Sequence, residues 1–509
     1  MRTTGRAILE RVVWREVLVV ALLGLGTVYV HLTVPGVVPS GPDGGNWLAM
    51  ARDRFLGESV MSATVTYPPF FPWLLSVLLL VTTPLVAIVS GALFAKCALV
   101  LAVYFCARSM GPFYAGLSAW LVGIGGAQLE AYAWGAYPQL LGTAFGTAAV
   151  YLMARHLETV RRGHLLGAFG FAALTYATHT LVGGLLVFAL PLAAAHQLWM
   201  LRSSPTAWVK GMSKAALLAA PGALIALYNF VLAPQPGVEP VLNPLAQTWT
   251  FSLQQTVSDA PLPWLLVAVL AVGALVYRRW PDGRSVTVAV GVSWVMVGVL
   301  FFAVIAEARA LLLTQLGLVL LAMLCFQRLL EAARSAKTRN PGRSLGRVAH
   351  SGLIILGVAT LSSISVGGVT SYLNSASWYR VVDRSELAAL DTLEELADDG
   401  DLVVAAQGHH GNQIGWWVQG YAGIPAYTAV DLRFLTFPEE REQALIANQI
   451  FDGTFDEAES IEALESIGAD YVVVDRRGPN DGWLNSGLAR RFRPVIESPT
   501  VVILEVPSS

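Results

Sequence analysis

Charged residues and cysteines are scarce in this sequence. Only 13% of its 509 residues are charged, against about 25% in an ordinary soluble chain. The three cysteines, Cys97, Cys106 and Cys325, all lie in apolar segments, so neither a disulfide framework nor a cysteine-based metal site is expected. The basic start of the chain leads into a full-length apolar run without a convincing small-residue cleavage site, so we do not expect a cleavable signal peptide.

Long apolar runs take the place of the missing charge. Hydrophobic residues make up 55% of the chain. The apolar segments lie near 17–35, 70–82, 86–107, 112–129, 138–154, 164–180, 182–200, 214–232, 262–277, 285–304, 310–327 and 349–369. Most of them approach or reach the roughly 17–25 residues that a membrane-spanning helix needs. The sequence therefore predicts an α-helical polytopic membrane protein whose surroundings are a lipid bilayer, and nucleic acid is not an expected partner.

The segment at 70–82, FFPWLLSVLLLVT, decides the orientation of the chain. At about 1.5 Å per residue it is too short to span a bilayer comfortably, and we interpret it as a re-entrant or interfacial helix. Lys and Arg concentrate in cytoplasmic loops, and leaving 70–82 out of the spans places 20 of the 24 basic residues of the membrane half inside. We therefore predict eleven spans in the cell membrane, a cytoplasmic N-terminus and a first outer loop at 36–84.

Acidic residues dominate the last part of the chain. From Ser371 onward there are 23 acids, nine arginines and no lysine, a net charge of −14, whereas residues 1–370 carry +12. This contrast predicts a membrane domain at 1–370 and a second domain at 371–509. Helical spacing in SELAALDTLEELADD and the strand-like runs DLVVAA, DYVVVD and VVILEV indicate an extracytoplasmic α/β domain. Its lysine-free surface is typical of a high-salt exterior and of haloarchaeal proteins, an ordinary acidic extracellular domain being the alternative.

Asp43 lies in the first outer loop, in the stretch GPDGGN, where glycine and proline predict a turn. A carboxylate at the outer membrane face is suited to act as a general base on an acceptor hydroxyl. The alternative is a turn carboxylate that bonds its own backbone.

Two basic residues are candidates for binding a phosphate. Lys96 interrupts the second span, where a buried charge costs about 3 kcal/mol or more, so it either reaches a lipid phosphate or snorkels to the interface. Arg309 begins a later span at the outer edge, and its planar guanidinium matches phosphate oxygens. An interfacial ion pair between Arg309 and Glu307 is the alternative.

The predicted topology places further polar residues on the same outer face. Candidate substrate contacts there are Glu130, Trp134, Tyr137, His179 and Glu307, although a lone histidine at a helix end is more often a packing group. In the outer domain, His409 and His410 in GHHGNQIGWW indicate either a loop that contacts sugar or phosphate, or a surface loop over buried tryptophans. Without a spaced carboxylate or cysteine nearby, the paired histidines are weak support for a metal.

These residues resemble the membrane glycosyltransferases of the GT-C superfamily. The acidic first outer loop and YPPFFPWLLS carry the resemblance, together with WGAYPQLLG, THTLVG, EARALLL and ADYVVVD, which are similar to elements of bacterial and archaeal members. The resemblance implies a multi-pass enzyme that takes sugars from polyprenyl- or dolichyl-phosphate carriers outside the cytoplasm. It implies that Asp43 is the catalytic base and that Arg309 faces the lipid phosphate.

The sequence departs from the oligosaccharyltransferase branch of that superfamily. Asp43 has no adjacent acid, and GWWVQG lacks the aspartate of the Trp-Trp-Asp motif. Neither whole-glycan transfer to asparagine nor a required divalent metal is therefore supported. We expect an inverting transferase that acts on a glycan, glycolipid or glycoprotein of the cell envelope. The alternatives are a transporter or flippase of lipid-linked sugar, which would need more polar residues near the midplane than Lys96, and a non-catalytic scaffold.

Overall fold

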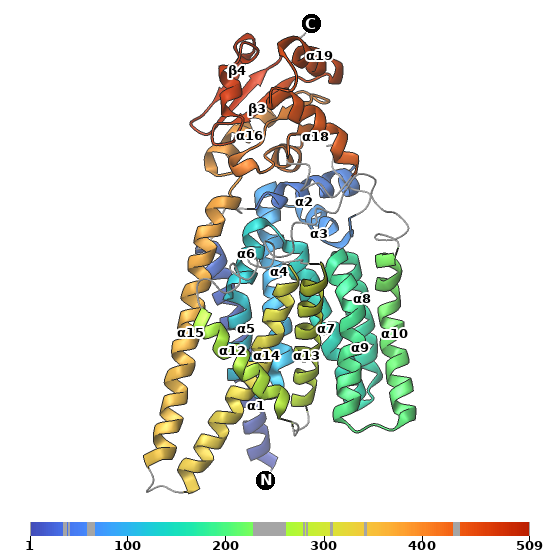
Figure 1. Ribbon diagram of the computed structural model, residues 1–509, viewed down its shortest axis with the longest axis vertical. Coiled ribbons are helices and arrows are strands. Elements are labelled where there is room, and N and C mark those ends of the chain that lie inside the picture. The colour runs from blue at the N-terminus through green and yellow to red at the C-terminus, as the bar shows by residue number, and fades with distance from the viewer. Residues whose placement is uncertain are drawn as a thin grey trace.

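Long helices run side by side through most of the molecule, and a smaller α/β domain covers one end of them (Figure 1). The computed structural model describes residues 2–33, 38, 41–58, 67–227, 261–277, 280, 283–305, 309–339, 344–430 and 438–507. The N-terminus lies at the far end of the helices from the α/β domain, and the C-terminus lies within that domain (Figure 1).

The helices of the bundle follow the apolar segments of the sequence. They are α1 (Arg2–Thr33), α4 (Pro84–Ala107), α5 (Pro112–Ile124), α6 (Gly126–Trp134), α7 (Tyr137–Thr159), α8 (Arg162–Thr178), α9 (Thr180–Met200), α10 (Pro205–Leu227), α12 (Pro261–Val276), α13 (Arg284–Ile305), α14 (Ala310–Arg339) and α15 (Ser344–Tyr379). Among the described residues, six helical stretches are long and apolar enough to cross a membrane by length and composition. The polytopic helical fold is confirmed, while the count of eleven spans stays a prediction.

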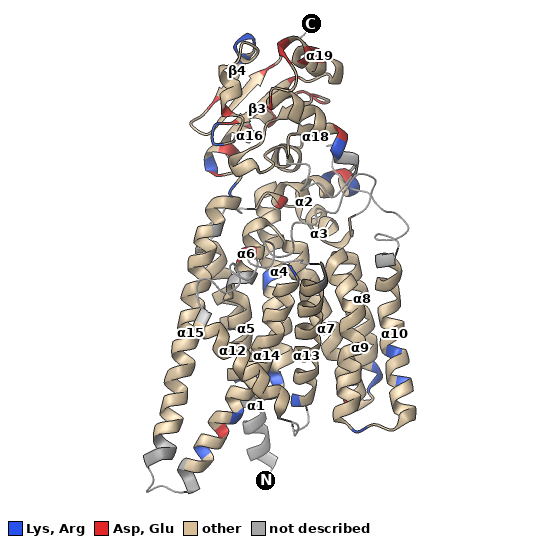
Figure 2. Cartoon of the chain, viewed as in Figure 1, with Lys and Arg blue, Asp and Glu red and all other residues tan. Residues whose placement is uncertain are grey.

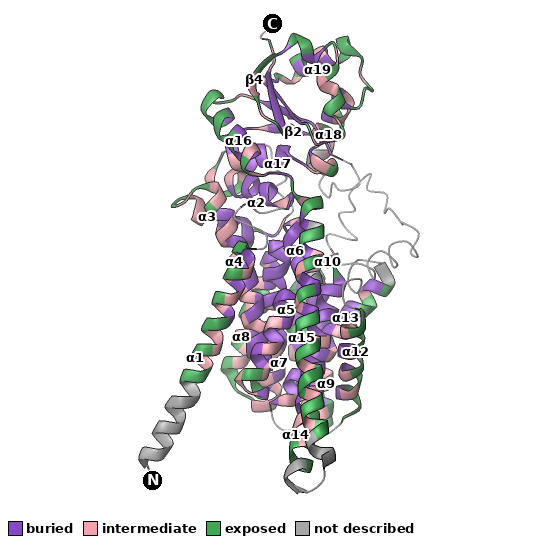
Figure 3. Cartoon of the chain, turned by 90° about the vertical axis from the view of Figure 1, so that its left-hand side faces the viewer, coloured by how far each residue is buried: buried purple, intermediate pink, exposed green. Residues whose placement is uncertain are grey.

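The outermost helices of the bundle expose apolar side chains, as a lipid-facing surface does. On α1, for example, Leu18, Leu25 and Tyr29 are exposed, whereas Leu99 on α4 and Leu141 on α7 are fully buried. Figure 3 shows this contrast between exposed α1 and α15 and the buried helices between them. Hydrocarbon outside the bundle removes the need for polar outer faces, which explains the low charge of the sequence.

Two short helices, α2 (Asp43–Ala51) and α3 (Phe70–Leu79), lie between the bundle and the α/β domain (Figure 1). At about 1.5 Å per residue, the ten residues of α3 extend about 15 Å, roughly half of the hydrocarbon core. The segment at 70–82 is therefore a short helix at the end of the bundle. A π-helical turn, η1 (Arg52–Leu56), continues α2 and ends at Gly57, whose φ of 75° favours glycine.

The C-terminal α/β domain, here called the outer domain, is built on a five-stranded sheet. Its strands are β1 (Val403–Ala405), β2 (Ala426–Thr428), β3 (Tyr471–Asp475), β4 (Arg493–Glu497) and β5 (Val501–Glu505). Their order is β2-β1-β3-β5-β4: the first three are parallel, and β5 runs antiparallel to both β3 and β4.

Helices cover both faces of this sheet. α16 (Arg384–Leu396), α17 (Gly415–Trp417) and the π-helical turn η5 (Val418–Ala422) pack on one face, where Leu390, Trp417 and Ile503 share a core. α18 (Pro438–Phe451) and α19 (Glu457–Ile467) pack on the other face, against Val472 and Leu504. The predicted α/β class is confirmed. The domain division near residue 370 stays a prediction, and α15 continues as one helix to Tyr379.

Short 3-10 turns complete the chain trace. They are η2 (Arg108–Met110), η4 (His409–Gly411), η7 (Asp481–Asn485) and η8 (Ala489–Arg491).

Charge divides the molecule along its length. Figure 2 shows acidic residues throughout the outer domain and most basic residues of the bundle near the end that lies away from it. This is the arrangement from which the positive-inside rule predicts a cytoplasmic N-terminus.

Candidate active site between the bundle and the outer domain

Asp43 is the first residue of α2, so the expectation that it lies in a turn is wrong. Its residue type is favourable there, because a carboxylate near a helix N-terminus interacts with the helix dipole. The preceding chain lies directly on the bundle: a Cβ at Gly41 would come within 2.3 Å of the Gly135 nitrogen. Gly135 in turn lies under Asp43, and Trp47 Nε1 donates a hydrogen bond to the Gly135 carbonyl at 2.8 Å. The turn between α6 and α7 therefore fixes the start of α2.

The carboxyl group of Asp43 is held among protein atoms and close to a cation. Burial raises the pKa of Asp43 from 3.8 to about 7, while the positive charge of Arg309 opposes part of that rise. Burial and the charge of Asp43 both raise the pKa of the Tyr67 phenol, and Arg309 again acts in the opposite direction. Asp43, Tyr67 and Arg309 thus form one electrostatic group built from residues far apart in sequence.

A row of rings lines this group. The Trp47 and Tyr67 rings are 4.7 Å apart, and Tyr67 meets the His179 ring edge-on at 6.3 Å. His179 also caps α9, because its Nδ1 accepts the Val182 N–H at 3.3 Å. His179 was predicted on this face from the sequence, whereas Tyr67 and Trp47 were not. The only signal for Tyr67 was its place at the head of the stretch YPPFFP.

The other predicted contacts of the first part of the chain lie around the same point. Glu130 and Tyr137 are buried, and Trp134 packs at 6.2 Å from Tyr379, the last residue of α15. Tyr379 lies within electrostatic range of both Glu130 and Asp43, as Tyr137 does of Asp43. Tyr379 is a further residue that the sequence analysis did not identify.

Arg309 precedes α14 and is exposed. Its carbonyl accepts a hydrogen bond from Gln139 Nε2 at 3.4 Å, which ties the start of α14 to α7. Glu307, the proposed ion-pair partner in the alternative interpretation, lies outside the described residues.

Lys96 is fully buried in α4, so the alternative that it snorkels to the interface is wrong. Its Nζ donates to the Gln128 carbonyl at 3.1 Å, and Gln128 Nε2 donates to the Leu312 carbonyl at 3.0 Å. This chain of contacts joins α4, α6 and α14. Phosphate binding by Lys96 stays a prediction.

His409 and His410 lie at the junction of the outer domain with α15. The His410 ring stacks on Trp378 at 4.1 Å, with 12° between the ring planes, and the His409 N–H donates to Asp475 Oδ2 at 3.1 Å. Asn412 Nδ2 also donates to the Trp378 carbonyl at 3.0 Å. These contacts tie the loop to α15, and the substrate-binding role of the two histidines stays a prediction.

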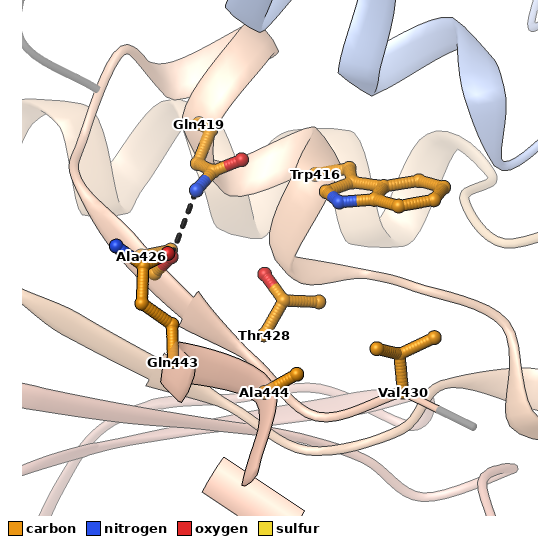
Figure 4. A pocket seen from close by; sticks show the side chains of 7 residues that line it. All are labelled: Trp416, Gln419, Ala426, Thr428, Val430, Gln443 and Ala444. Atoms are coloured by element: carbon orange, nitrogen blue, oxygen red, sulfur yellow. Dashed lines mark hydrogen bonds between the residues drawn. The ribbon is translucent and has the colours of Figure 1, made fainter. Parts of the chain in front are cut away.

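A small polar pocket lies in the outer domain between η5, β2 and α18 (Figure 4). Figure 4 shows Trp416, Gln419, Thr428 and Gln443 around it. Its volume of about 10 Å³ accommodates about one water molecule and not a sugar ring. Thr428 Oγ1 is buried without a hydrogen-bond partner in the described part of the chain, which suits such a water. Among the described residues, no group of three or more His, Cys, Asp or Glu side chains is placed to hold a metal ion.

The electrostatic group offers two complementary chemical functions. A carboxyl group that ionises near neutral pH is matched to removing a proton from a hydroxyl, and an adjacent guanidinium is matched to an anion such as a phosphate. Both lie where the helical bundle meets the outer domain.

The fold is similar to that of a solved protein, ArnT. The structure of ArnT from Cupriavidus metallidurans bound to undecaprenyl phosphate matches with 14% sequence identity and a TM-score of 0.57, over 96% of this chain and 97% of that one. ArnT in the apo state matches with 15% identity and a TM-score of 0.56, over 99% and 98% of the two chains. The archaeal oligosaccharyltransferase AglB from Archaeoglobus fulgidus, in complex with an inhibitory peptide and a dolichol-phosphate, matches with 12% identity and a TM-score of 0.46, over 90% and 69%.

No protein-family model matches the sequence, and a comparison with curated proteins found no match either. The likeness to ArnT extends over nearly the whole of both chains. It shows that this chain has the GT-C fold, as the resemblance in its sequence predicted.

Proposed function

We propose that the chain is a membrane glycosyltransferase that moves a sugar from a polyprenyl- or dolichyl-phosphate donor to an acceptor outside the cytoplasm. The observation that carries the proposal is the fold shared with ArnT, in which Asp43 stands at the start of α2 within electrostatic range of Arg309. The alternative, a transporter of lipid-linked sugar, would need charged or polar residues along several helices near the midplane, where the sequence has essentially Lys96 alone.

In the proposed reaction, Arg309 holds the phosphate of the donor through its planar fork of N–H groups. Asp43 removes the proton of an acceptor hydroxyl, whose oxygen attacks the anomeric carbon from the side opposite the phosphate. The bond from that carbon to the phosphate oxygen breaks, and the lipid phosphate leaves with the electron pair. A phosphate is a stable anion, so its departure requires no strong general acid and one carboxylate suffices.

A single displacement of this kind inverts the configuration at the anomeric carbon. The acceptor in this proposal is a glycan, glycolipid or glycoprotein of the cell envelope. The partly exposed Tyr67 and Tyr379 rings would offer flat apolar surfaces to the sugar faces. The acceptor would arrive from water on the outer-domain side, and the donor would enter from the bilayer between the helices.

The test uses cells that lack the chain and are complemented with wild type, Asp43→Asn or Asp399→Asn. Asp399 is exposed in the outer domain and serves as the matched control. Mass spectrometry of envelope glycans should show a species that wild type and Asp399→Asn restore and Asp43→Asn does not. Full restoration by Asp43→Asn would exclude this residue as the base. Identical glycans with and without the wild-type chain would exclude sugar transfer.

A further inference from the structure

The helix that carries Asp43 is held from two sides. One side lies on the bundle through Gly41, Gly135 and Trp47, as described above. The other side lies against residues 415–423 of the outer domain, here called the clamp segment. All eight residues of α2 that follow Asp43 are buried. Figure 3 shows α17, the start of the clamp segment, directly over α2.

At Gly45 and Gly420 the contact between α2 and the clamp segment is made by backbone atoms. A Cβ on Gly45 would lie 2.6 Å from the carbonyl carbon and oxygen of Trp416, and a Cβ on Gly420 would lie 2.0 Å from the Gly45 oxygen. Gly44 faces the Trp417 ring in the same way, at 2.9 Å. Because no flexible side chain separates the two backbones here, a shift of the clamp segment displaces α2 as well.

Arg52, the residue after α2, locks this contact. Its Nε donates to the Gly420 carbonyl at 2.8 Å, and its Nη2 donates to the Tyr421 carbonyl at 3.1 Å. A Cβ on Gly423 would lie 2.9 Å from Arg52 Nη1, so the end of the clamp segment also leaves no room beside the guanidinium. The clamp segment includes the π-helical turn η5, a feature that occurs frequently at functional sites.

The clamp segment is itself anchored in the outer domain. Trp417 and Val418 are fully buried in the core that packs on one face of the sheet, and Tyr421 Oη donates to Asp391 of α16 at 2.8 Å. A helix of nine residues is too short to be stable alone, so α2 takes its position from these surroundings.

We propose that the clamp segment is a positioning element for the reaction: Gly420 and Arg52 hold the helix that carries Asp43 at its working distance from Arg309 and the acceptor. The outer domain is thus required for the chemical step as well as for meeting the acceptor. The proposal rests on the proposed function in so far as Asp43 is the base.

The expected size of the effect follows from the close approach. An ordinary contact of a carbon with another heavy atom is about 3.5 Å, so alanine at 420 must push Gly45 away by more than 1 Å. A misplacement of about 1 Å in a catalytic group reduces the rate by roughly 100-fold. Gly420→Ala should therefore reduce the initial rate of transfer about 100-fold. Gly482→Ala is the matched control, because a Cβ there meets nothing within 4 Å.

Two measurements on the full-length chain test the proposal. The first is hydrogen exchange of residues 43–51 in lipid nanodiscs, followed by mass spectrometry. Gly420→Ala should accelerate this exchange about tenfold while strand β3 keeps its protection, and Gly482→Ala should change neither. The second is the initial rate of glycan formation in membranes of the complemented cells, which contain the native donor and acceptor. Unchanged exchange of 43–51, or transfer by Gly420→Ala at the wild-type rate, would overturn the proposal.

Arg52→Lys provides a test if Gly420→Ala loses the protection of β3 and fails to fold. Lysine keeps the positive charge but cannot reproduce the two hydrogen bonds that the guanidinium donates to the Gly420 and Tyr421 carbonyls. The expected result is a lower maximal rate with unchanged KM for the acceptor and a displaced pH profile, which loss of stability alone does not produce. Wild-type rates and an unchanged pH profile in Arg52→Lys would contradict the proposal. If wild-type membranes form no glycan, the proposed function fails, and hydrogen exchange still decides whether the clamp segment positions α2.

Discussion

Replacement of Asp43 by asparagine is expected to stabilise the folded protein at neutral pH while it removes transfer. Burial raises the pKa of this carboxyl group from 3.8 to about 7, so the ionised form is disfavoured in the folded state. A difference of about three pH units corresponds to about 4 kcal/mol, at about 1.4 kcal/mol for each. That figure is the upper bound for the stability that Asp43→Asn gains above pH 7.

The direction of the pH dependence follows from proton binding. Between about pH 4 and pH 7 the folded state binds a proton that the unfolded state releases, so the Asp43 contribution to stability falls as the pH rises through this range. Thermal unfolding midpoints at pH 5 and pH 8 should therefore differ more for wild type than for Asp43→Asn. The exposed Asp399→Asn variant should behave as wild type does. Equal decreases for wild type and Asp43→Asn would refute the assignment of Asp43 to a low-dielectric site.

Activity should depend on the same ionisation in the opposite sense. A general base acts in its ionised form, so the transfer rate should rise with pH up to about 7 and then level off. Asp43→Asn should lose about 10²–10⁴-fold of the rate, the usual contribution of general base catalysis. If the Asp43→Asn variant were stabilised yet fully active, Asp43 would not be the catalytic base.

Three further predictions concern other residues. Arg309→Gln should raise the KM for the lipid donor about 10–100-fold, since a charged hydrogen bond contributes about 1.5–3 kcal/mol. It should also move the pH midpoint of transfer upward, whereas Arg309→Lys, which keeps the charge, should keep the midpoint. Equal pH midpoints for the two variants would contradict this prediction. Arg477→Met should destabilise strand β3 by about 3–5 kcal/mol in hydrogen exchange, because it leaves Asp475 and Glu386 buried without their cation. Arg491→Met, which loses an exposed pair with Glu457, should cost less than about 1 kcal/mol, and similar costs for the two would oppose the reasoning. An impermeant maleimide should label Asp399→Cys on intact cells and Ser204→Cys only after permeabilisation, and the reverse pattern would invert the predicted sidedness.

Much of the fold could be predicted because the signals are local. The length of the apolar runs predicted the bundle helices, and leucines at helical spacing predicted α16. The N-terminus of α16 carries the capping box of Asp383 and Glu386. Buried strands such as β3 and β5 appeared as continuous apolar runs. Two strands were not predicted: β2, which has three residues, and β4, whose side chains are mostly exposed. Neither has a periodicity long enough to be recognised.

The candidate site was only partly predictable, because its geometry depends on contacts between distant segments. Asp43 and Arg309 were predicted from residue type and topology. Their closeness depends on the contact of Asp43 with Gly135, just before α7, and on the hydrogen bond from Gln139 of α7 to the Arg309 carbonyl. Glycine and proline around Asp43 predicted a turn. Gly44 and Gly45 instead allow the close approach of the outer domain. Gly420, which contacts Gly45, lies more than 370 residues away in the sequence. Tyr379 could not be predicted as part of the site either, because the residue it contacts, Trp134, belongs to another helix.

The position of the site between two parts of the chain accounts for its chemistry under the proposed function. A donor held in lipid and an acceptor held in water can meet only at a boundary, where water would normally keep the pKa of an aspartate near 4 and make it a weak base. The clamp segment covers the residues of α2 that follow Asp43, and burial raises the pKa of Asp43 to about 7. The bundle supplies Arg309 and the Gly135 backbone that contacts Asp43, and the outer domain covers the rest of α2. Because Gly44 and Gly45 next to Asp43 lie against the clamp segment, we expect that withdrawing it would admit water to this end of α2, lower the pKa of the carboxyl group and weaken it as a base.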